Sequence, residues 1–296
     1  MANPYFGRLL TAMVTPFAAD GSVNHEAGAK FANWLLDNGT DALVVEGSTG
    51  EAATMNMEEK VAFVRTIKAA VNGRAPIVVG AGTNCTATTI ELCKTMEAEG
   101  VDGLLIVGPF YNKPTQEGYY QHFAAIAKAT KLPIIVYNVP GRTGSNILPA
   151  TIARLANDFE NIVAVKEAAG SVAQCAELYR VLPKRITIYS GDDGLIVPFM
   201  SVGATGLISV LSNCNGNILQ EVMQAFENGE VKKAADLNAV MVPLANAMFV
   251  ETNPIPIKYA ASKATGIDMG IPRLPLTELT EAGKAKVDAA MKAAGM

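Results

Sequence analysis

Short, nearly continuous apolar runs recur along most of the chain. They are rich in Val, Ile and Leu, and they do not alternate between apolar and polar residues as the strands of a half-exposed sheet do. Each run therefore predicts a strand that is buried on both faces. The eight predicted strands cover residues 9–15, 41–46, 76–80, 103–107, 133–138, 162–166, 186–190 and 205–210.

Amphipathic stretches with helix-capping signals separate these strands. Asn56 followed by Glu59 is a candidate capping box, and Thr115 after Pro114 predicts another helix start. The repetition of strand and helix predicts right-handed βαβ units and a parallel sheet. Eight such units favour an α/β fold of the closed (β/α)8 TIM barrel type, with an open doubly wound sheet as the alternative.

The pattern changes after about residue 229, where the strand signal stops. A small C-terminal helical domain over residues 229–296 is therefore predicted to follow a catalytic barrel over residues 1–228. The proline-containing segment 253–256 would divide its helices, and an Ala/Lys-rich helix would close it. The apolar residues that recur at helical spacing in its first helix are Leu237, Val240, Met241, Leu244 and Met248.

Composition and charge narrow the class of protein. Half of the 296 residues are apolar and 18% are charged, so a large core can be buried. The net charge of −4 and the absence of a Lys/Arg run argue against a nucleic-acid partner. The chain starts without a signal-peptide pattern and has no continuously apolar window long enough for a membrane span, so we expect a cytoplasmic protein.

Cysteine and histidine usage points away from disulfides and zinc. The four cysteines lie far apart, as expected for buried thiols in a reducing compartment. The two histidines, His25 and His122, are widely separated and form no cluster with cysteines. The usual ligand set of a catalytic zinc is therefore missing. A magnesium held by Asp and Glu stays open as an alternative, but nothing in the sequence points to one, and we predict no metal site.

Lys166 ends the apolar run of the sixth predicted strand, and working groups in a barrel come from such strand ends. A lysine there can reach solvent or pair with Glu167, which is the ordinary interpretation. The alternative is a nucleophile, because an amine attacks a carbonyl group only when it is neutral. An apolar barrel interior would lower the lysine pKa from about 10.4 toward 7–8, a bias of roughly 4 kcal/mol.

Three loops at other strand ends carry further candidate groups. Tyr137 could exchange protons with an amine, or could be a core residue whose hydroxyl is hydrogen bonded. Arg142 suits a carboxylate, unless it is a surface arginine. The loop 47–51 offers hydroxyls and close backbone approach but could equally be a plain turn or a phosphate cradle. The loop 108–114 presents Tyr111, or is an ordinary packed loop.

Segments at these strand ends match one known family in order and spacing. They are Gly47-Ser-Thr-Gly-Glu51, Pro109-Phe-Tyr-Asn-Lys-Pro114, Tyr137-Asn-Val-Pro-Gly-Arg-Thr-Gly144, Val165-Lys-Glu167 and Ser190-Gly-Asp-Asp193. Together with Glu251-Thr-Asn-Pro-Ile-Pro256 in the tail, they resemble the dihydrodipicolinate synthase family, within the N-acetylneuraminate lyase superfamily. The resemblance runs essentially from end to end.

This resemblance implies a class I (Schiff-base) lyase that condenses pyruvate with L-aspartate 4-semialdehyde to 4-hydroxy-tetrahydrodipicolinate, in the diaminopimelate/lysine biosynthesis pathway. Lys166 would hold pyruvate as an imine, and Tyr137 would be the general acid/base beside it. Ser48 and Tyr111 would complete a proton relay with Tyr137. The imine itself is the electron sink, so no metal or organic cofactor is implied.

The resemblance also implies how the substrates bind and how subunits assemble. Thr49, with Ser48, would hold the pyruvate carboxylate, and Arg142 would receive the carboxylate of aspartate semialdehyde. Gly191 and Ile208 would line the pocket through their backbone. The family tyrosine that matches Tyr111 reaches into a neighbouring site, which implies a homotetramer, a dimer of dimers.

Two departures from the family pattern lead to expectations. Many relatives have Thr at the place of Ser48, so this side chain is freer about χ1 although activity should persist. Lysine-inhibited members often carry His, His, Glu and Tyr where this chain has Met57, Lys60, Thr88 and Phe110, while Asn84 is retained. A cationic ligand would lose a carboxylate and meet a like charge, so we expect weak or absent inhibition by lysine.

Other functions remain as alternatives. The nearest is another pyruvate-dependent aldolase of the same superfamily that cleaves a sugar acid. A second is a catalytically silent barrel that binds a keto acid as a sensor, although a mere binder needs no nucleophile. A zinc aldolase is disfavoured by the two separated histidines.

Overall fold

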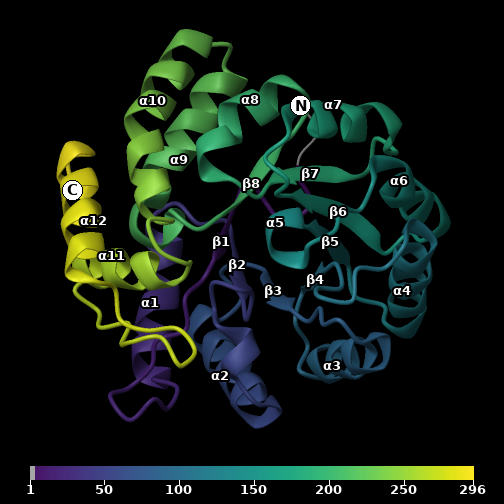
Figure 1. Ribbon diagram of the computed structural model, residues 1–296, viewed down its shortest axis with the longest axis horizontal. Coiled ribbons are helices and arrows are strands. Elements are labelled where there is room, and N and C mark those ends of the chain that lie inside the picture. Colours follow the sequence, from purple (N-terminus) through teal and green to yellow (C-terminus); the bar gives the residue numbers. More distant parts are fainter. Residues whose placement is uncertain (1–3) are drawn as a thin grey trace.

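Eight parallel strands close into a barrel in the computed structural model, which describes residues 4–296 (Figure 1). Each strand pairs with its neighbours in sequence, and β8 pairs with β1, so the sheet is closed rather than open. The strands are β1 Leu9–Ala12, β2 Ala42–Val45, β3 Ile77–Gly80, β4 Gly103–Val107, β5 Ile134–Asn138, β6 Ile162–Glu167, β7 Thr187–Ser190 and β8 Gly206–Ser209.

These bounds confirm the predicted strands, with one visible difference. β1 ends at Ala12, whereas the apolar run predicted a strand to residue 15. The chain leaves the ladder there because the backbone N–H of Val14 donates to Oδ1 of Asn213, at 3.0 Å, rather than to a neighbouring strand. An apolar run thus predicts a buried segment, but not always a strand. The backbone N–H groups of such a segment can bond to a side chain from a distant part of the chain in place of a neighbouring strand.

Helices follow the strands, and the longer ones form the outer ring of the barrel, whereas the short α5 lies near the centre of the view in Figure 1. Both predicted helix starts are confirmed: Asn56 and Glu59 form a reciprocal capping box, and Oγ1 of Thr115 accepts from the N–H of Gly118. The helices of this part are α1 His25–Asp37, α2 Met57–Val71, α3 Thr86–Ala98, α4 Gln116–Ala129, α5 Pro140–Thr143, α6 Pro149–Asp158, α7 Val172–Val181, α8 Ile196–Ser201 and α9 Ser212–Glu227, with 3₁₀ turns η1 Ala52–Thr54 and η2 Asp193–Leu195.

Two apolar layers explain why the strand sequences do not alternate in polarity. The side chains that point outward pack between the sheet and the helices, and those that point inward fill the barrel. The inner layer includes Leu10, Val44, Val78, Leu105, Ile135, Tyr137, Tyr189 and Ile208. Because the interior is filled with apolar groups, a polar side chain that enters it loses contact with water.

The C-terminal helices α10 Val231–Ala247, α11 Ile255–Thr265 and α12 Glu281–Ala293 lie together on one side of the barrel (Figure 1). In α10, Met241 and Leu244 are buried as helical spacing predicts, whereas Val240 is 55% exposed. We keep the division at residues 228/229 as a proposal, since it falls in the turn between α9 and α10. Residues 1–3 of the predicted barrel domain lie outside the described residues.

Three further observations concern membranes, thiols and metals. No helix within residues 4–296 is both long and apolar enough to cross a membrane. Cys93, Cys175 and Cys214 are buried free thiols, but Cys85 is exposed, so the expectation of buried thiols was wrong there. Cys85 precedes α3 as its N-cap residue, a position on the surface of the helical ring. Across the described part of the chain, no three His, Cys, Asp or Glu side chains gather as a metal site would require.

Candidate active site

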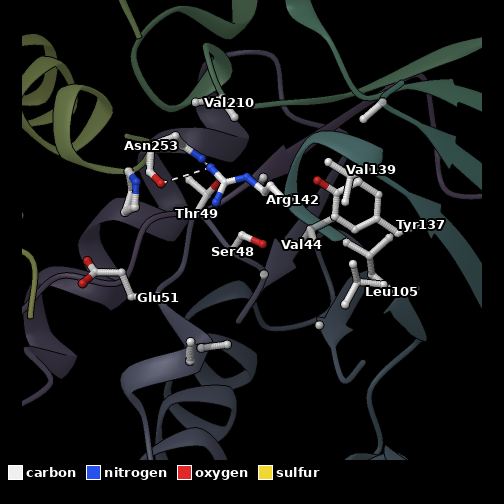
Figure 2. A pocket seen from close by; sticks show the side chains of 18 of the residues that line it. Val44, Ser48, Thr49, Glu51, Leu105, Tyr137, Val139, Arg142, Val210 and Asn253 are labelled. Carbon is white, nitrogen blue, oxygen red and sulfur yellow. Dashed lines mark hydrogen bonds between the residues drawn. The ribbon is translucent and has the colours of Figure 1, made fainter. Parts of the chain in front are cut away.

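A cavity of about 860 Å³ opens where the strands end and the loops begin (Figure 2). Its walls come from the ends of several strands, from the loop after β2, and from the C-terminal segment around Asn253. The carboxyl ends of barrel strands are where parallel α/β barrels place their working groups. Of the residues predicted for the site, those that line this cavity are Lys166, Tyr137, Ser48, Thr49, Arg142 and Gly191.

Lys166 and Tyr137 face each other across neighbouring strands. They are direct register partners on β6 and β5, and Nζ of Lys166 lies 4.4 Å from the centroid of the Tyr137 ring. Both side chains are buried, with exposed fractions of 5% and 8%. The strand register therefore places the amine and the phenol side by side without help from a flexible loop.

Burial sets the protonation of both groups. It lowers the pKa of Lys166 to about 8; the charge of Arg142 adds to this effect and that of Asp193 opposes it. A fall from 10.5 to about 8 corresponds to about 3 kcal/mol of bias toward the neutral amine. Burial also raises the pKa of Tyr137 to about 12, with Arg142 in opposition, so the phenol keeps its proton at neutral pH. The pair thus combines a nucleophilic amine with a proton donor.

Gly191, just after β7, leaves the room that Lys166 occupies. A Cβ atom at this position would lie 3.0 Å from Cε of Lys166 and 2.6 Å from Cβ of Ala168. Any larger residue would therefore push against the lysine stem or the backbone beside it. The glycine thus serves the site through the space it leaves.

The loop after β2 carries the hydroxyl groups of the site. Ser48 is exposed to the cavity, whereas Thr49 is buried and its Oγ1 accepts a hydrogen bond of 3.0 Å from Nδ2 of Asn253. Arg142 donates from Nη2 to the carbonyl oxygen of Asn253, at 3.2 Å (Figure 2). Asn253 therefore connects the hydroxyl loop to the arginine, and both point toward the same space.

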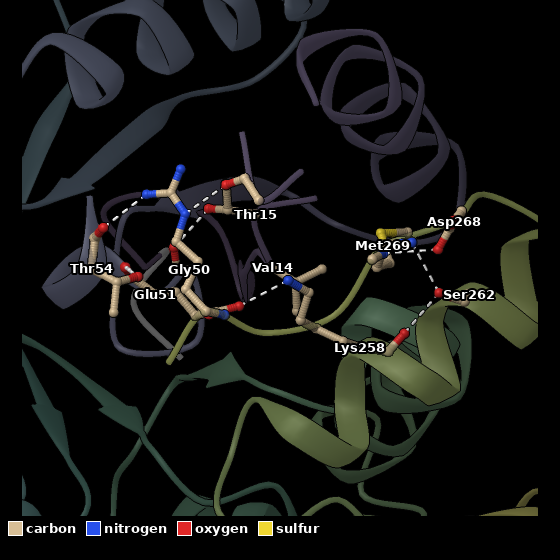
Figure 3. Close-up of polar contacts among 12 residues, drawn as sticks. Val14, Thr15, Gly50, Glu51, Thr54, Lys258, Ser262, Asp268 and Met269 are labelled. Carbon is tan, nitrogen blue, oxygen red and sulfur yellow. Dashed lines mark hydrogen bonds and ion pairs between the residues drawn. The ribbon is translucent and has the colours of Figure 1, made fainter. Parts of the chain in front are cut away.

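A buried ion pair anchors the far end of this loop (Figure 3). Nζ of Lys258 lies 2.8 Å from Oε1 of Glu51, and the two side chains are 1% and 2% exposed. The backbone N–H of Arg273 donates to the other carboxylate oxygen at 2.9 Å. Glu51 adopts a left-handed backbone conformation with φ of 54°. The C-terminal segment thus fixes a conformation that a non-glycine residue rarely adopts alone.

Two predicted site residues lie elsewhere. The side chain of Tyr111 is 89% exposed and does not line the cavity. Ile208 is fully buried in the inner layer of the barrel and is also absent from the cavity wall. Within residues 4–296, no hydrogen bond joins the hydroxyls of Tyr137, Ser48 and Tyr111. A relay through these three groups is therefore not assembled within one chain.

Glu46 and Asp193 are among the acidic residues that line the cavity and received no role from the sequence. Glu46 is 1% exposed, and neither of its carboxyl oxygens has a hydrogen-bond partner among residues 4–296. Burial raises its pKa to about 8, against the opposing charge of Lys60. Asp193 is held by the hydroxyl of Ser209 and by two backbone N–H groups. Glu46 ends an apolar run as Lys166 does, so the same signal could have found it.

Comparison with known proteins gives a consistent result. The model of the dihydrodipicolinate synthetase family matches residues 5–294. The 4-hydroxy-tetrahydrodipicolinate synthase of Moorella thermoacetica is 48% identical over 291 residues, which cover 98% of this chain and 99% of that relative. That of Desulforamulus reducens is 47% identical over 280 residues, covering 95% and 94% of the two chains.

Solved structures agree in fold along nearly the whole chain. Dihydrodipicolinate synthase from Bacillus anthracis superposes with a TM-score of 0.95 at 44% identity and covers 98% of both chains. The enzyme from Cyanidioschyzon merolae, solved with lysine bound, superposes with a TM-score of 0.96 at 41% identity and covers 99% of both chains.

Proposed function

The chain belongs to the dihydrodipicolinate synthetase family, and we propose that Lys166 and Tyr137 carry out the chemistry of that family here. The reaction is the condensation of pyruvate with L-aspartate 4-semialdehyde to 4-hydroxy-tetrahydrodipicolinate, a lyase activity of diaminopimelate and lysine biosynthesis. One observation supports the residue assignment above all others. Lys166 is buried at the end of β6 with its amine 4.4 Å from the Tyr137 ring centroid.

The proposed cycle begins with the neutral amine. Nζ of Lys166 attacks the keto carbon of pyruvate, and Tyr137 donates a proton to the oxygen that becomes the leaving water. The resulting imine withdraws electrons, so the methyl group loses a proton to the phenolate that Tyr137 has become, and an enamine forms. The enamine carbon attacks the aldehyde carbon of the second substrate. The amino group of that substrate then attacks the imine carbon, closes the ring and releases Lys166.

The binding roles follow from where polar groups face the cavity. Ser48 and Thr49 offer hydroxyl and backbone donors to the carboxylate of pyruvate. Arg142, which lines the same cavity, suits the carboxylate of aspartate semialdehyde, because a guanidinium group can bind a carboxylate through two hydrogen bonds. Ile208 packs in the same inner cluster as Tyr137, and we propose that its backbone borders the bound pyruvate.

Tyr111 leads to a proposal about assembly. Its side chain is 89% exposed and its φ of 71° is rare for a non-glycine residue. We propose that it enters the cavity of a second copy, within a homotetramer built from two dimers. The four cysteines are free thiols, which supports the further proposal that the enzyme works in the reducing cytoplasm.

A mixing experiment tests the role of Tyr111 between subunits. Tyr111→Phe and Lys166→Ala proteins, each nearly inactive, are combined and allowed to exchange subunits. If Tyr111 acts in the partner's site, a mixed dimer contains one site with native Lys166 and native Tyr111, and activity returns. If Tyr111 acts only within its own chain, mixing leaves both proteins inactive and the proposal fails.

Substrate use tests the function itself. We expect product from pyruvate and aspartate semialdehyde with the native protein and none with Lys166→Ala. Arg142→Ala should raise the KM for the semialdehyde by at least about tenfold, a loss of roughly 1.4 kcal/mol of binding, while pyruvate still forms its imine. A native protein that cleaves a sugar acid but ignores the semialdehyde would overturn the substrate assignment.

A further inference from the structure

Strand β6 carries a β-bulge shortly before Lys166. Ile134 of β5 pairs with Ile162, but the next residue, Ile135, pairs with Ala164, so Val163 is an extra residue on β6. Val163 and Ala164 both belong to the inner apolar layer, and Ile162 and Val165 belong to the outer one. The regular alternation of inward and outward side chains is therefore interrupted once, at this point.

This interruption decides where Lys166 points. In a regular strand, side chains two and four residues after Ile162 would lie on the same face as Ile162, which is the outer face. Lys166 would then face the helices instead of the cavity. With the bulge, it becomes the register partner of Tyr137 and points inward. A one-residue shift of register would reverse this placement.

The residues next to the reactive pair fix the register on the outer face. Asn138 pairs with Glu167, as Tyr137 pairs with Lys166. The carboxylate of Glu167, fully buried, accepts hydrogen bonds from Nδ2 of Asn138 at 3.1 Å and from Nε2 of Gln174 at 2.9 Å. It also accepts one from the backbone N–H of Ala169 at 2.7 Å. One carboxylate thus joins β5, β6 and α7.

The orientation of the two amides makes this position specific for a carboxylate. Oδ1 of Asn138 accepts from the N–H of Ile147 at 3.0 Å, and Oε1 of Gln174 accepts from Nδ2 of Asn146 at 2.8 Å. Both amides therefore present their NH₂ groups to Glu167, and neither can rotate without losing another bond. A glutamine at this position would set donor against donor, because its NH₂ group would face either these two amides or the backbone N–H of Ala169.

We propose that Glu167 is a positioning residue for Lys166, because its hydrogen bonds clamp β5 to β6 in the register that the bulge creates. Glu167 does not line the cavity, so it acts through the strand and not through contact with substrate. Lys166 itself faces Tyr137, Asp193 and Arg142, and none of these is altered when Glu167 is changed. The inference rests on the proposed function, since it assigns a role in orienting the amine of that reaction.

The test is Glu167→Gln, with Glu177→Gln on the exposed part of α7 as a matched control. The first readout needs no substrate. It is the pH at which Lys166 is half-maximally acylated by a small amine-reactive acylating reagent, measured by peptide mass analysis. We expect the midpoint to rise by at least about half a pH unit, because an amine released from the apolar interior regains its ordinary pKa. The second readout is imine formation with pyruvate, expected to slow at least about tenfold, with KM for the semialdehyde within about twofold.

A charge-swapped double variant separates positioning from folding. Glu167→Gln together with Gln174→Glu puts the carboxylate on the other side of the same network, where the new amide at 167 and Asn146 can donate to it. We expect the native midpoint to return. If the single variant does not fold, a folded swap with a native midpoint supports the proposal and one with a raised midpoint overturns it. A folded single variant with unchanged midpoint and imine rate also overturns it.

The two readouts keep this inference apart from the proposed function. If the native protein forms no imine with pyruvate, the proposed function fails. The acylation midpoint would still report whether Glu167 holds the amine in the barrel interior.

Discussion

Two buried lysines of this molecule have opposite surroundings. Lys166, at the β5–β6 edge, is 5% exposed, lies over a tyrosine ring and forms no salt bridge among residues 4–296. Lys258, in the C-terminal segment, is 1% exposed and lies 2.8 Å from the carboxylate of Glu51. Burial lowers the pKa of both, but at Lys258 the neighbouring Glu51 opposes the shift. Asp193 also opposes the fall at Lys166, but only Lys258 is in direct contact with a carboxylate, so its charge is the better stabilised of the two.

The two regions are also held in place differently. Where β5 and β6 pair, the strand register and the hydrogen bonds of Glu167 position Lys166 and Tyr137. The loop after β2 depends on residues far away in the sequence: Thr49 and its donor Asn253 are 204 positions apart. The barrel thus holds the amine that we propose to react, whereas the C-terminal segment supports the loop that would receive the substrate. Changes in the two regions should have separable effects on chemistry and on stability.

The largest expected effect is on kcat, from a change where β5 and β6 pair. Tyr137→Phe keeps the ring that packs beside Lys166 and removes only the proton donor. We expect kcat to fall by about 10²–10⁴-fold, the usual contribution of a general acid, with little change in stability. The control is Tyr189→Phe in the same inner layer, whose hydroxyl donates to the backbone carbonyl of Gly7. A Tyr137→Phe protein within tenfold of native kcat would remove the phenol from the mechanism.

A large loss of stability is expected at the other lysine. Lys258→Ala leaves the Glu51 carboxylate buried without its ion-pair partner, which should lower the free energy of unfolding by about 3–5 kcal/mol. Lys263→Ala removes an exposed pair with Asp288 and should change it by less than about 1 kcal/mol. Urea denaturation measures both. Equal losses for the two variants would mean that burial of the Glu51 pair does not matter.

Glu46, beside the same loop, should make stability depend on pH. Burial raises the pKa of Glu46 in the folded protein from its ordinary value of 4.5 to about 8, so the folded protein binds one more proton than the unfolded chain between these pH values. The contribution of Glu46 to the free energy of unfolding is therefore fully present below about pH 4.5. It is lost as the pH rises toward 8, at about 1.4 kcal/mol per pH unit.

The isosteric variant Glu46→Gln isolates this contribution. Between pH 6 and 7.5, the stability difference between native protein and Glu46→Gln should change by about 2 kcal/mol, with the native protein losing more. Urea denaturation at the two pH values gives the comparison. If the native protein gained stability relative to the variant over this interval, Glu46 would be a partnered carboxylate and not an isolated one.

The smallest effect is expected from lysine as a ligand. Lys60 lines the cavity, and position 88 carries a threonine in place of the carboxylate that lysine-inhibited relatives often have. We expect millimolar lysine to inhibit by less than about twofold, because the cation meets a like charge. Lys60→His combined with Thr88→Glu should increase inhibition. Strong inhibition of the native protein in a dose-response assay would show that neither residue controls lysine binding.

Local patterns predicted the fold closely because each strand and cap depends on residues near it in sequence. The apolar runs located all eight strands, and Asn56 with Glu59 located the start of α2. Lys166 stood out because a charged side chain ends an apolar run. These signals are short-range, because periodicity and helix capping each depend on residues a few positions apart.

What could not be predicted depends on contacts between distant segments. The bulge at Val163 is invisible because both faces of β6 are apolar, so no alternation reveals the break. The pairing of Glu51 with Lys258 joins residues 207 positions apart. The position of Tyr111 outside its own cavity follows from loop geometry that the motif alone does not contain.

The central claim is that Lys166 is the amine that binds pyruvate, and borohydride trapping tests it most directly. The folded protein is incubated with pyruvate and borohydride near pH 8, close to the pKa of Lys166, and then analysed by intact mass and peptide mapping. Lys258, equally buried but paired with Glu51, is the internal control. A reduced pyruvyl adduct on Lys166 and none on Lys258 is the predicted result; no adduct, or an adduct on another lysine, would contradict the account.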